Sequence, residues 1–151
     1  MIRKGTISDW PIITEYNIAM AWETEKKVLD CNTVTEGVKA ILADSTKGYY
    51  YVYEVDSQTV GQLMVTYEWS DWRNGYFWWI QSVYVAPQHR HKGIYKQLYQ
   101  EVRAQAAKQK DVCGIRLYVE KHNIRAQKTY QSLGMEETDY LVYEELFKIL
   151  N

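Results

Sequence analysis

The junction between residues 76–86 and the segment after Gly93 limits the fold more than any other feature of this chain. Residues 76–86, YFWWIQSVYVA, are mostly aromatic or β-branched, which favours a strand, and Pro87 ends the run. After Gly93 the apolar residues recur every four positions, as Ile94, Leu98, Val102 and Ala106. That spacing is typical of a helix with one buried face. A strand that leads directly into an amphipathic helix predicts an α/β unit.

The first half of the chain predicts two helices and two further strands. Residues 8–22 have helical spacing, with Ser8 or Asp9 as N-cap and Pro11 in the first turn. Residues 32–44 predict a second helix, capped by Thr33 or Thr35. The remaining elements predicted here are a weak edge strand over residues 1–6, two strands rich in Tyr and Val over residues 47–69, a turn between them at Asp56–Gln58, and a hairpin turn at Asn74–Gly75.

The last third of the chain predicts a strand over residues 112–120 and a short helix over residues 123–134 that stops at Gly134. Residues 140–149 predict a final strand, or a strand pair with residues 135–138. The chain has 151 residues, a length typical of one domain. The element order therefore predicts a single α/β domain over residues 1–151, with a mixed sheet.

Composition and charge exclude several classes of function. The formal net charge is −1, so the chain as a whole has no electrostatic attraction for nucleic acid or an acidic membrane. Aromatic residues beside basic ones raise a single-stranded nucleic-acid binder as an alternative, which the net charge disfavours. Cys31 and Cys113 fit no metal-ligand spacing, and no apolar run suits a signal peptide or a membrane span. We expect a cytoplasmic protein with no metal, no nucleic acid and no membrane partner.

The corner between strand and helix has the chemistry of an anion site. A helix that begins here leaves several backbone N–H groups without helical acceptors, and the helix dipole is positive at that end. Gly93 lets a ligand approach the backbone, while Arg90, His91 and Lys92 add positive charge. This stretch alone leaves open a solvated loop in which Gly93 serves only backbone geometry.

Two motifs together carry a family resemblance. The segments SVYVAPQHRHKGIYKQL and RLYVEKHNIRAQKTYQSLGM place Arg90 to Tyr95 in a first motif. A second motif comprises Asn123, Ala126, Tyr130, Gly134 and Met135. In this order the motifs resemble the GNAT superfamily of acetyl-CoA-dependent N-acetyltransferases. The resemblance implies a mixed, mostly antiparallel sheet of six to seven strands flanked by about four helices. Tyr95 departs from the Gly or Ala usual at the end of the loop motif, so its side chain has to point away from bound phosphates.

The resemblance also implies roles for individual residues. Acetyl-CoA would be the co-substrate, a primary amine the acceptor, and Tyr130 the general acid that protonates the leaving thiolate. The residues implied for acetyl-CoA binding are Val83, Tyr84 and Val85 along the pantetheine arm, Arg90 in the turn, the backbone of His91, Lys92, Gly93, Ile94, Tyr95 and Lys96 at the pyrophosphate, and Asn123 with Tyr130 near the arm. Some relatives have a Glu where this chain has Gln81, which cannot act as a base. Glu68 is the first candidate for the base and Glu120 the second; either is equally well a solvated surface carboxylate.

Carboxylates mixed with aromatic faces favour a cationic acceptor. The residues implied in that region are Trp22, Glu23, Trp69, Asp71 and Trp72, together with Glu68. The acceptor would then be a small cationic amine, although the same Trp residues suit a core or a homodimer contact equally well. Two other functions stay open: a CoA- or nucleotide-binding module without catalysis, and acetylation of a protein N-terminus or lysine.

Overall fold

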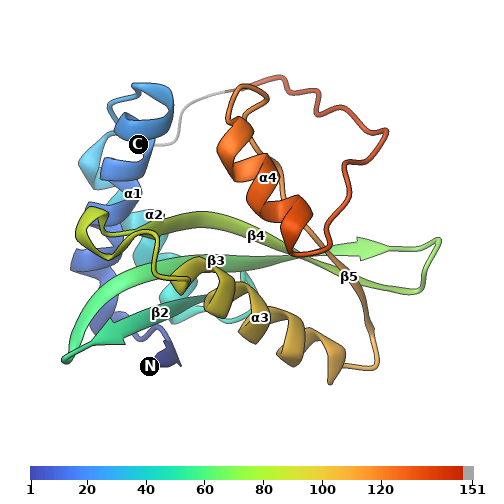
Figure 1. Cartoon of the computed structure of the whole chain (residues 1–151), viewed down its shortest axis with the longest axis horizontal. Coiled ribbons are helices and arrows are strands. Elements are labelled where there is room, and N and C mark those ends of the chain that lie inside the picture. Colours follow the sequence, from blue (N-terminus) through green and yellow to red (C-terminus); the bar gives the residue numbers. More distant parts are fainter. Residues whose placement is uncertain (148–151) are drawn as a thin grey trace. The chain divides into compact units, whose positions relative to one another are not determined.

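The computed structural model describes residues 1–147, which form two compact units (Figure 1). The first unit is Met1–Leu117, and the second begins at Tyr118. The predicted single domain over residues 1–151 stays a prediction.

The first unit contains one sheet of five strands in the order β1-β2-β3-β4-β5. All neighbours are antiparallel except β4 and β5, which are parallel and joined by a helix. This confirms the predicted mixed α/β class, with fewer strands than the six to seven expected. The strands are β1 (Ile2–Lys4), β2 (Tyr49–Val55), β3 (Gln58–Ser70), β4 (Gly75–Val85) and β5 (Val112–Arg116).

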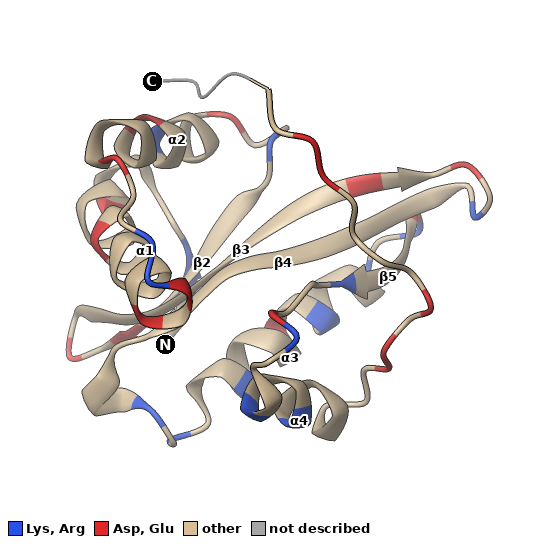
Figure 2. Ribbon diagram, turned by 90° about the horizontal axis from the view of Figure 1, so that it is seen from above, with Lys and Arg blue, Asp and Glu red and all other residues tan. Residues whose placement is uncertain are grey.

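Helices cover both faces of the sheet. Figures 1 and 2 show α1 (Trp10–Glu25) and α2 (Cys31–Ala43) on one face and α3 (Ile94–Ala107) on the other. The buried side of α3 consists of the residues that set its four-residue period, together with Tyr99. A core cluster under α1 and α2 consists of Ile13, Val38, Ile41, Tyr50 and Val52.

The ends of the first two helices differ in part from the prediction. Asp9 is the N-cap position of α1, as predicted, but its carboxylate accepts from Thr6 N (2.7 Å) rather than from α1. The cap of α2 is Asp30, whose side chain accepts from Thr33 N (2.9 Å), so the prediction of Thr33 or Thr35 was wrong. Asp30 lies in a polar stretch with no periodic pattern, so the sequence did not indicate that it caps the helix.

The predicted turns lie within a residue of their observed positions. Asp56 and Ser57 both have positive φ (49° and 62°), the geometry of a tight hairpin turn, and Gln58 already belongs to β3. Asn74 has φ 48°, and Gly75 begins β4.

The second unit contains one helix in its described part. Helix α4 (Ile124–Ser132) is followed by Gly134 with φ 91°, as predicted. Residues 140–147 form no strand, and the end of the predicted strand, residues 148–149, lies outside the described residues. Within residues 1–147, no helix is long and apolar enough to cross a membrane.

Candidate active site

Strand β4 has an irregularity where the sheet opens. Gln62 pairs with Tyr84 and Met64 with Gln81, so β4 has one residue more than β3 across this step. Ser82 lies in this β-bulge with φ 52°, which is uncommon for a residue with a side chain. The parallel pairing of β4 with β5 ends at Trp79, six residues before β4 ends at Val85 (85 − 79). The last part of β4, including Val83, Tyr84 and Val85, therefore runs beyond its paired neighbour.

A buried polar network holds the bulge. The Gln62 side chain is fully buried, and its Nε2 donates to Asn17 Oδ1 (2.8 Å) and to the carbonyl of Ser82 (3.1 Å). Asn17 Nδ2 donates to the Tyr50 hydroxyl (3.1 Å). Burial raises the pKa of Tyr50, opposed by its hydrogen bonds to Asn17 and Ser82. The network ties the bulge to α1 and β2 inside the core.

Arg90 braces the loop that follows β4. Its Nε donates to the carbonyl of Val85 (2.8 Å), and its Nη2 lies 2.7 Å from Glu23 Oε2. The guanidinium also lies over the Tyr84 ring, whose hydroxyl donates to Glu23 (3.3 Å). This geometry agrees with a role for Arg90 in shaping the turn. It also engages Glu23, which was predicted to bind substrate.

The start of α3 exposes backbone with room above it. Gly93 is the N-cap with φ 77°, and a Cβ placed on it would meet nothing within 4 Å. His91, two residues earlier, also has a positive φ of 62°. The first hydrogen bond in the helix direction runs from Gln97 N to the carbonyl of Gly93 (3.1 Å), and helix geometry leaves the preceding N–H groups without intrahelical acceptors. The loop therefore presents an open helix N-terminus, which suits a phosphate.

Tyr95 does not crowd this loop. Its ring lies 6.4 Å from the ring of Tyr99, one turn further along α3. The large side chain therefore packs along the helix.

Glu68 lies on β3 with two donors on one carboxylate oxygen. Trp79 Nε1 (2.8 Å) and Arg116 Nη1 (3.0 Å) both donate to Oε1. The hydrogen bond from Trp79, followed by that from Arg116, lowers the pKa of the Glu68 carboxyl. A carboxylate stabilised in this way is a weaker base than a carboxylate without these two donors. Gln81 donates to Thr66 Oγ1 (2.7 Å), on the inner part of the sheet.

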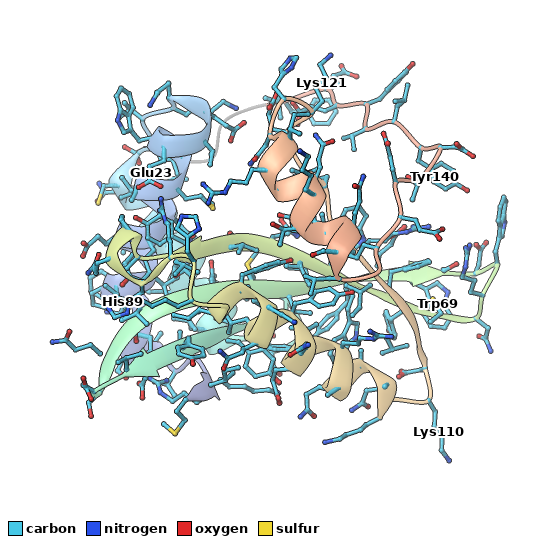
Figure 3. The ribbon with its side chains drawn as sticks, viewed as in Figure 1. Glu23, Trp69, His89, Lys110, Lys121 and Tyr140 are labelled. Carbon is cyan, nitrogen blue, oxygen red and sulfur yellow. The ribbon has the colours of Figure 1, made fainter. Side chains whose placement is uncertain are left out.

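The residues predicted for a cationic acceptor lie in two separate places. Trp22 and Glu23 are near the end of α1, whereas Trp69, Asp71 and Trp72 are at the tip of the β3–β4 hairpin. Figure 3 shows Glu23 and Trp69 at opposite ends of the sheet. Trp22, Trp69 and Trp72 are all more than half exposed. The structure does not bring this set together, which removes the main argument for a cationic substrate.

Three predicted residues belong to the second unit. Asn123 caps α4, its Oδ1 accepting from Ala126 N (3.2 Å). Tyr130 lies on α4, and burial raises the pKa of its phenol. Glu120, the second candidate for the base, accepts from His122 N (2.8 Å). Within residues 1–147, no three or more His, Cys, Asp or Glu side chains are grouped to hold a metal ion.

Comparison with known families decides the relationship. The family model of the acetyltransferase (GNAT) family matches residues 12–135. The chain belongs to the GNAT acetyltransferase family. A comparison with curated protein sequences found no match.

Solved structures support this placement. A possible acetyltransferase from Clostridium difficile 630 has 48% identity over 100% of this chain and 98% of its own, with a TM-score of 0.91. A predicted acetyltransferase with acetyl-CoA from Clostridium acetobutylicum has 16% identity over 96% of this chain and 95% of its own, with a TM-score of 0.79. AAC(6')-Iy, in complex with a bisubstrate analog, has 17% identity over 98% of both chains and a TM-score of 0.75. The last two show likeness of fold.

For this GNAT-family protein, sequence reasoning missed the residues that hold the bulge. No local pattern indicates a positive φ at Ser82, because a bulge depends on the partner strand. Gln62 could have been singled out from the sequence, because it is the polar residue within the apolar run VGQLMV. Asn17 lies on a helix face together with apolar residues, and only the packed structure shows that it is buried.

Proposed function

We propose that this GNAT-family protein transfers an acetyl group from acetyl-CoA to the nitrogen of a primary amine. The observation that carries the proposal is the separation of β4 from β5 beside the bulge at Ser82, directly before an open helix N-terminus. Acetyl-CoA consists of an extended amide arm and a pyrophosphate. A strand edge without a neighbour suits the arm, and the start of α3 suits the pyrophosphate.

The chain's own residues would bind this co-substrate mainly through backbone groups. The strand edge at Val83, Tyr84 and Val85 would pair with the arm. The backbone N–H groups from His91 to Lys96 would hold the pyrophosphate, with Arg90 keeping the loop in shape from its bonds to Val85 and Glu23. In the second unit, Asn123 would contact the arm. The open space above Gly93 is consistent with a bound phosphate.

The thioester of acetyl-CoA supplies an activated acetyl group and a thiolate leaving group. A backbone N–H near Val83, beside the bulge, would polarise the acyl carbonyl as an oxyanion donor does. Tyr130 would donate a proton to the leaving sulfur. The phenol is protonated at neutral pH because its ordinary pKa is about 10, and burial raises that pKa further. Glu68 would receive the amine proton directly or through a water, since its two donors both bind Oε1.

Replacing Tyr130 tests the reaction. Tyr130→Phe removes the hydroxyl but keeps the ring, so we expect kcat to fall about a hundredfold or more, with the KM for acetyl-CoA little changed. Thiol release from acetyl-CoA with a panel of amines and a lysine peptide measures both values. Tyr143→Phe is the matched control, since Tyr143 is 90% exposed in the same unit.

Equal turnover by wild type and Tyr130→Phe would remove Tyr130 as the acid. Tight CoA binding without turnover on any acceptor would instead favour a binding module. Turnover on the lysine peptide alone would point to a protein acceptor. A cytoplasmic location and a homodimer stay predictions from the sequence.

A further inference from the structure

A hollow lies between α2 and strands β2 and β3, on the face of the sheet that α1 and α2 cover. Its volume is about 380 Å³, within the range of small-molecule sites. Apolar side chains make up much of the wall: Val34, Val38, Ile41 and Met64, with the ring of Tyr50. Asn17, Thr66 and Lys47 supply the polar groups. A ligand with an apolar body fits this lining.

Gly37 in α2 lines the same hollow and has no structural reason to be glycine. It lies inside a helix, where glycine is less stable than alanine. Its φ is not positive, and a Cβ built on it meets nothing within 4 Å. Neither backbone geometry nor close packing therefore requires the missing side chain. The missing side chain at position 37 leaves the hollow open.

The charge on the wall argues against a cation. Among the lining residues that the structure describes, none is Asp or Glu, and Lys47 is the charged one. Lys47 Nζ lies 3.3 Å from Asp44 Oδ2, with side chains 55% and 43% exposed. An exposed pair of this kind is weak, and an ammonium has three donors, so Lys47 can also bind an anionic group of a ligand.

The two ends of the hollow differ in what they face. Asn17 and Tyr50 belong to the network that holds the Ser82 bulge, where the acyl group would be presented. Tyr50 pairs with Met64 beside the bulge and Tyr49 with Val65, so the antiparallel register leads the chain before β2, which contains Lys47, away from the bulge. An occupant with its amine at the bulge would therefore direct its far end toward Lys47.

We propose that this hollow is the acceptor pocket and that its substrate is a primary amine with a compact apolar body and an anionic group at the opposite end. The inference rests on the proposed acetyl transfer and specifies its acceptor. It replaces the cationic acceptor that the sequence suggested.

Three matched amines test the class of substrate. They share a benzylamine body and differ at the para position: para-aminomethylbenzoate is anionic there, para-methylbenzylamine neutral and para-xylylenediamine cationic. We expect kcat/KM in thiol release to be highest for the benzoate and lowest for the diamine. Lys47→Gln should lower the value for the benzoate about three- to fivefold, the size of an exposed ion pair, and leave the neutral amine unchanged. A preference for the diamine would overturn the charge assignment.

Filling the hollow tests its location. Gly37→Phe places a ring in the open space and improves helix propensity, so the variant should be at least as stable as wild type. We expect the KM for para-methylbenzylamine to rise about tenfold or more, as when a pocket loses apolar contact area, with the KM for acetyl-CoA unchanged. Ala40→Phe, on an exposed position of α2 outside the lining, is the control. A wild-type KM in Gly37→Phe would overturn the pocket.

A binding measurement separates this inference from the proposed reaction. If wild type releases no thiol with any amine, the proposed reaction fails. The hollow is then tested by the methyl signal of Met64 in NMR titrations with para-methylbenzylamine. A shift in wild type that is lost in Gly37→Phe supports an amine pocket. No shift in wild type overturns it.

Discussion

Gln62 shows how one buried polar side chain connects a core to a site. Burying an amide without partners costs free energy, and Gln62 is fully buried. Its Nε2 donates one hydrogen bond to Asn17 and one to the carbonyl of Ser82. The positive φ of Ser82 is itself unfavourable. The hydrogen bonds thus hold a strained backbone directly before Val83, the region of the proposed oxyanion donor.

Removing that amide should affect the reaction more than the binding. In Gln62→Leu the carbonyl of Ser82 and Asn17 Oδ1 lose a donor, so we expect about 1–3 kcal/mol of lost stability. Because the bulge is then less constrained, kcat should fall while the KM for acetyl-CoA changes little. Steady-state kinetics below the unfolding temperature measure the two separately, and Gln58→Leu at an exposed position of the same strand is the control. An unchanged kcat with lower stability would limit Gln62 to a structural role.

At the scale of elements, the junction of β4 and α3 combines two backbone features that neither element has alone. The strand extends past its parallel neighbour, and the helix begins at a glycine with positive φ and open space beside it. Arg90 fixes the intervening loop by bonding to the strand end and to α1. We therefore expect the positively charged side chains around it to contribute less to pyrophosphate binding than the backbone N–H groups do.

A charge at Gly93 should weaken acetyl-CoA binding. Gly93→Asp places a carboxylate at the proposed pyrophosphate position, and we expect the KM for acetyl-CoA to rise about tenfold or more, equivalent to at least about 1.4 kcal/mol. Gly93→Asn is the matched control, because Asn has nearly the same shape, tolerates positive φ and is uncharged. The Asp variant should be clearly weaker than the Asn variant. Equal KM values in the two would contradict the pyrophosphate placement.

At the scale of the whole molecule, an ion cluster joins the start of the chain to the sheet of the first unit. Arg3 forms two hydrogen bonds to Asp9 (both 2.8 Å) and one to Glu54 (2.7 Å). The Asp9 side chain is only 10% exposed. The hydrogen bonds from Arg3, partly opposed by burial, lower the pKa of Asp9 below its ordinary value. Arg3, on β1, thereby links Asp9 in the first turn of the chain to Glu54 on β2.

The pH dependence of stability follows from the direction of this shift. A carboxyl with a lowered folded pKa stabilises the fold at neutral pH, and the contribution is lost as the pH falls below about 4 toward the folded pKa. Asp9→Asn should therefore unfold more easily than wild type at neutral pH, by about 1–3 kcal/mol. The difference should shrink at pH values below about 4. Urea unfolding across this range measures it; a difference independent of pH would contradict the role of the Asp9 charge.

Most of the fold was predictable from sequence because its signals are local. Helical spacing, Asn74-Gly75 and the Gly93 junction each depend on neighbouring residues, and all were confirmed within a few positions. The cap of α2 and the final strand were wrong because Asp30 lies outside any periodic pattern, and β-propensity in residues 140–147 did not produce pairing. A strand needs a partner, and propensity alone does not provide one.

The features of the candidate site also fall into local ones, which the sequence predicts, and long-range ones, which it does not. By itself the sequence determined the family motifs, the strand-to-helix loop and the order of the elements, because these reside in contiguous stretches of chain. Only the tertiary structure decided that the aromatic residues of α1 and of the hairpin lie at opposite ends of the sheet. It also decided that Gln62 holds a bulge and that Gly37 opens a hollow. The physical reason is that a cavity, a bulge and a buried hydrogen bond are each made by segments far apart in the sequence, and they exist only once those segments pack.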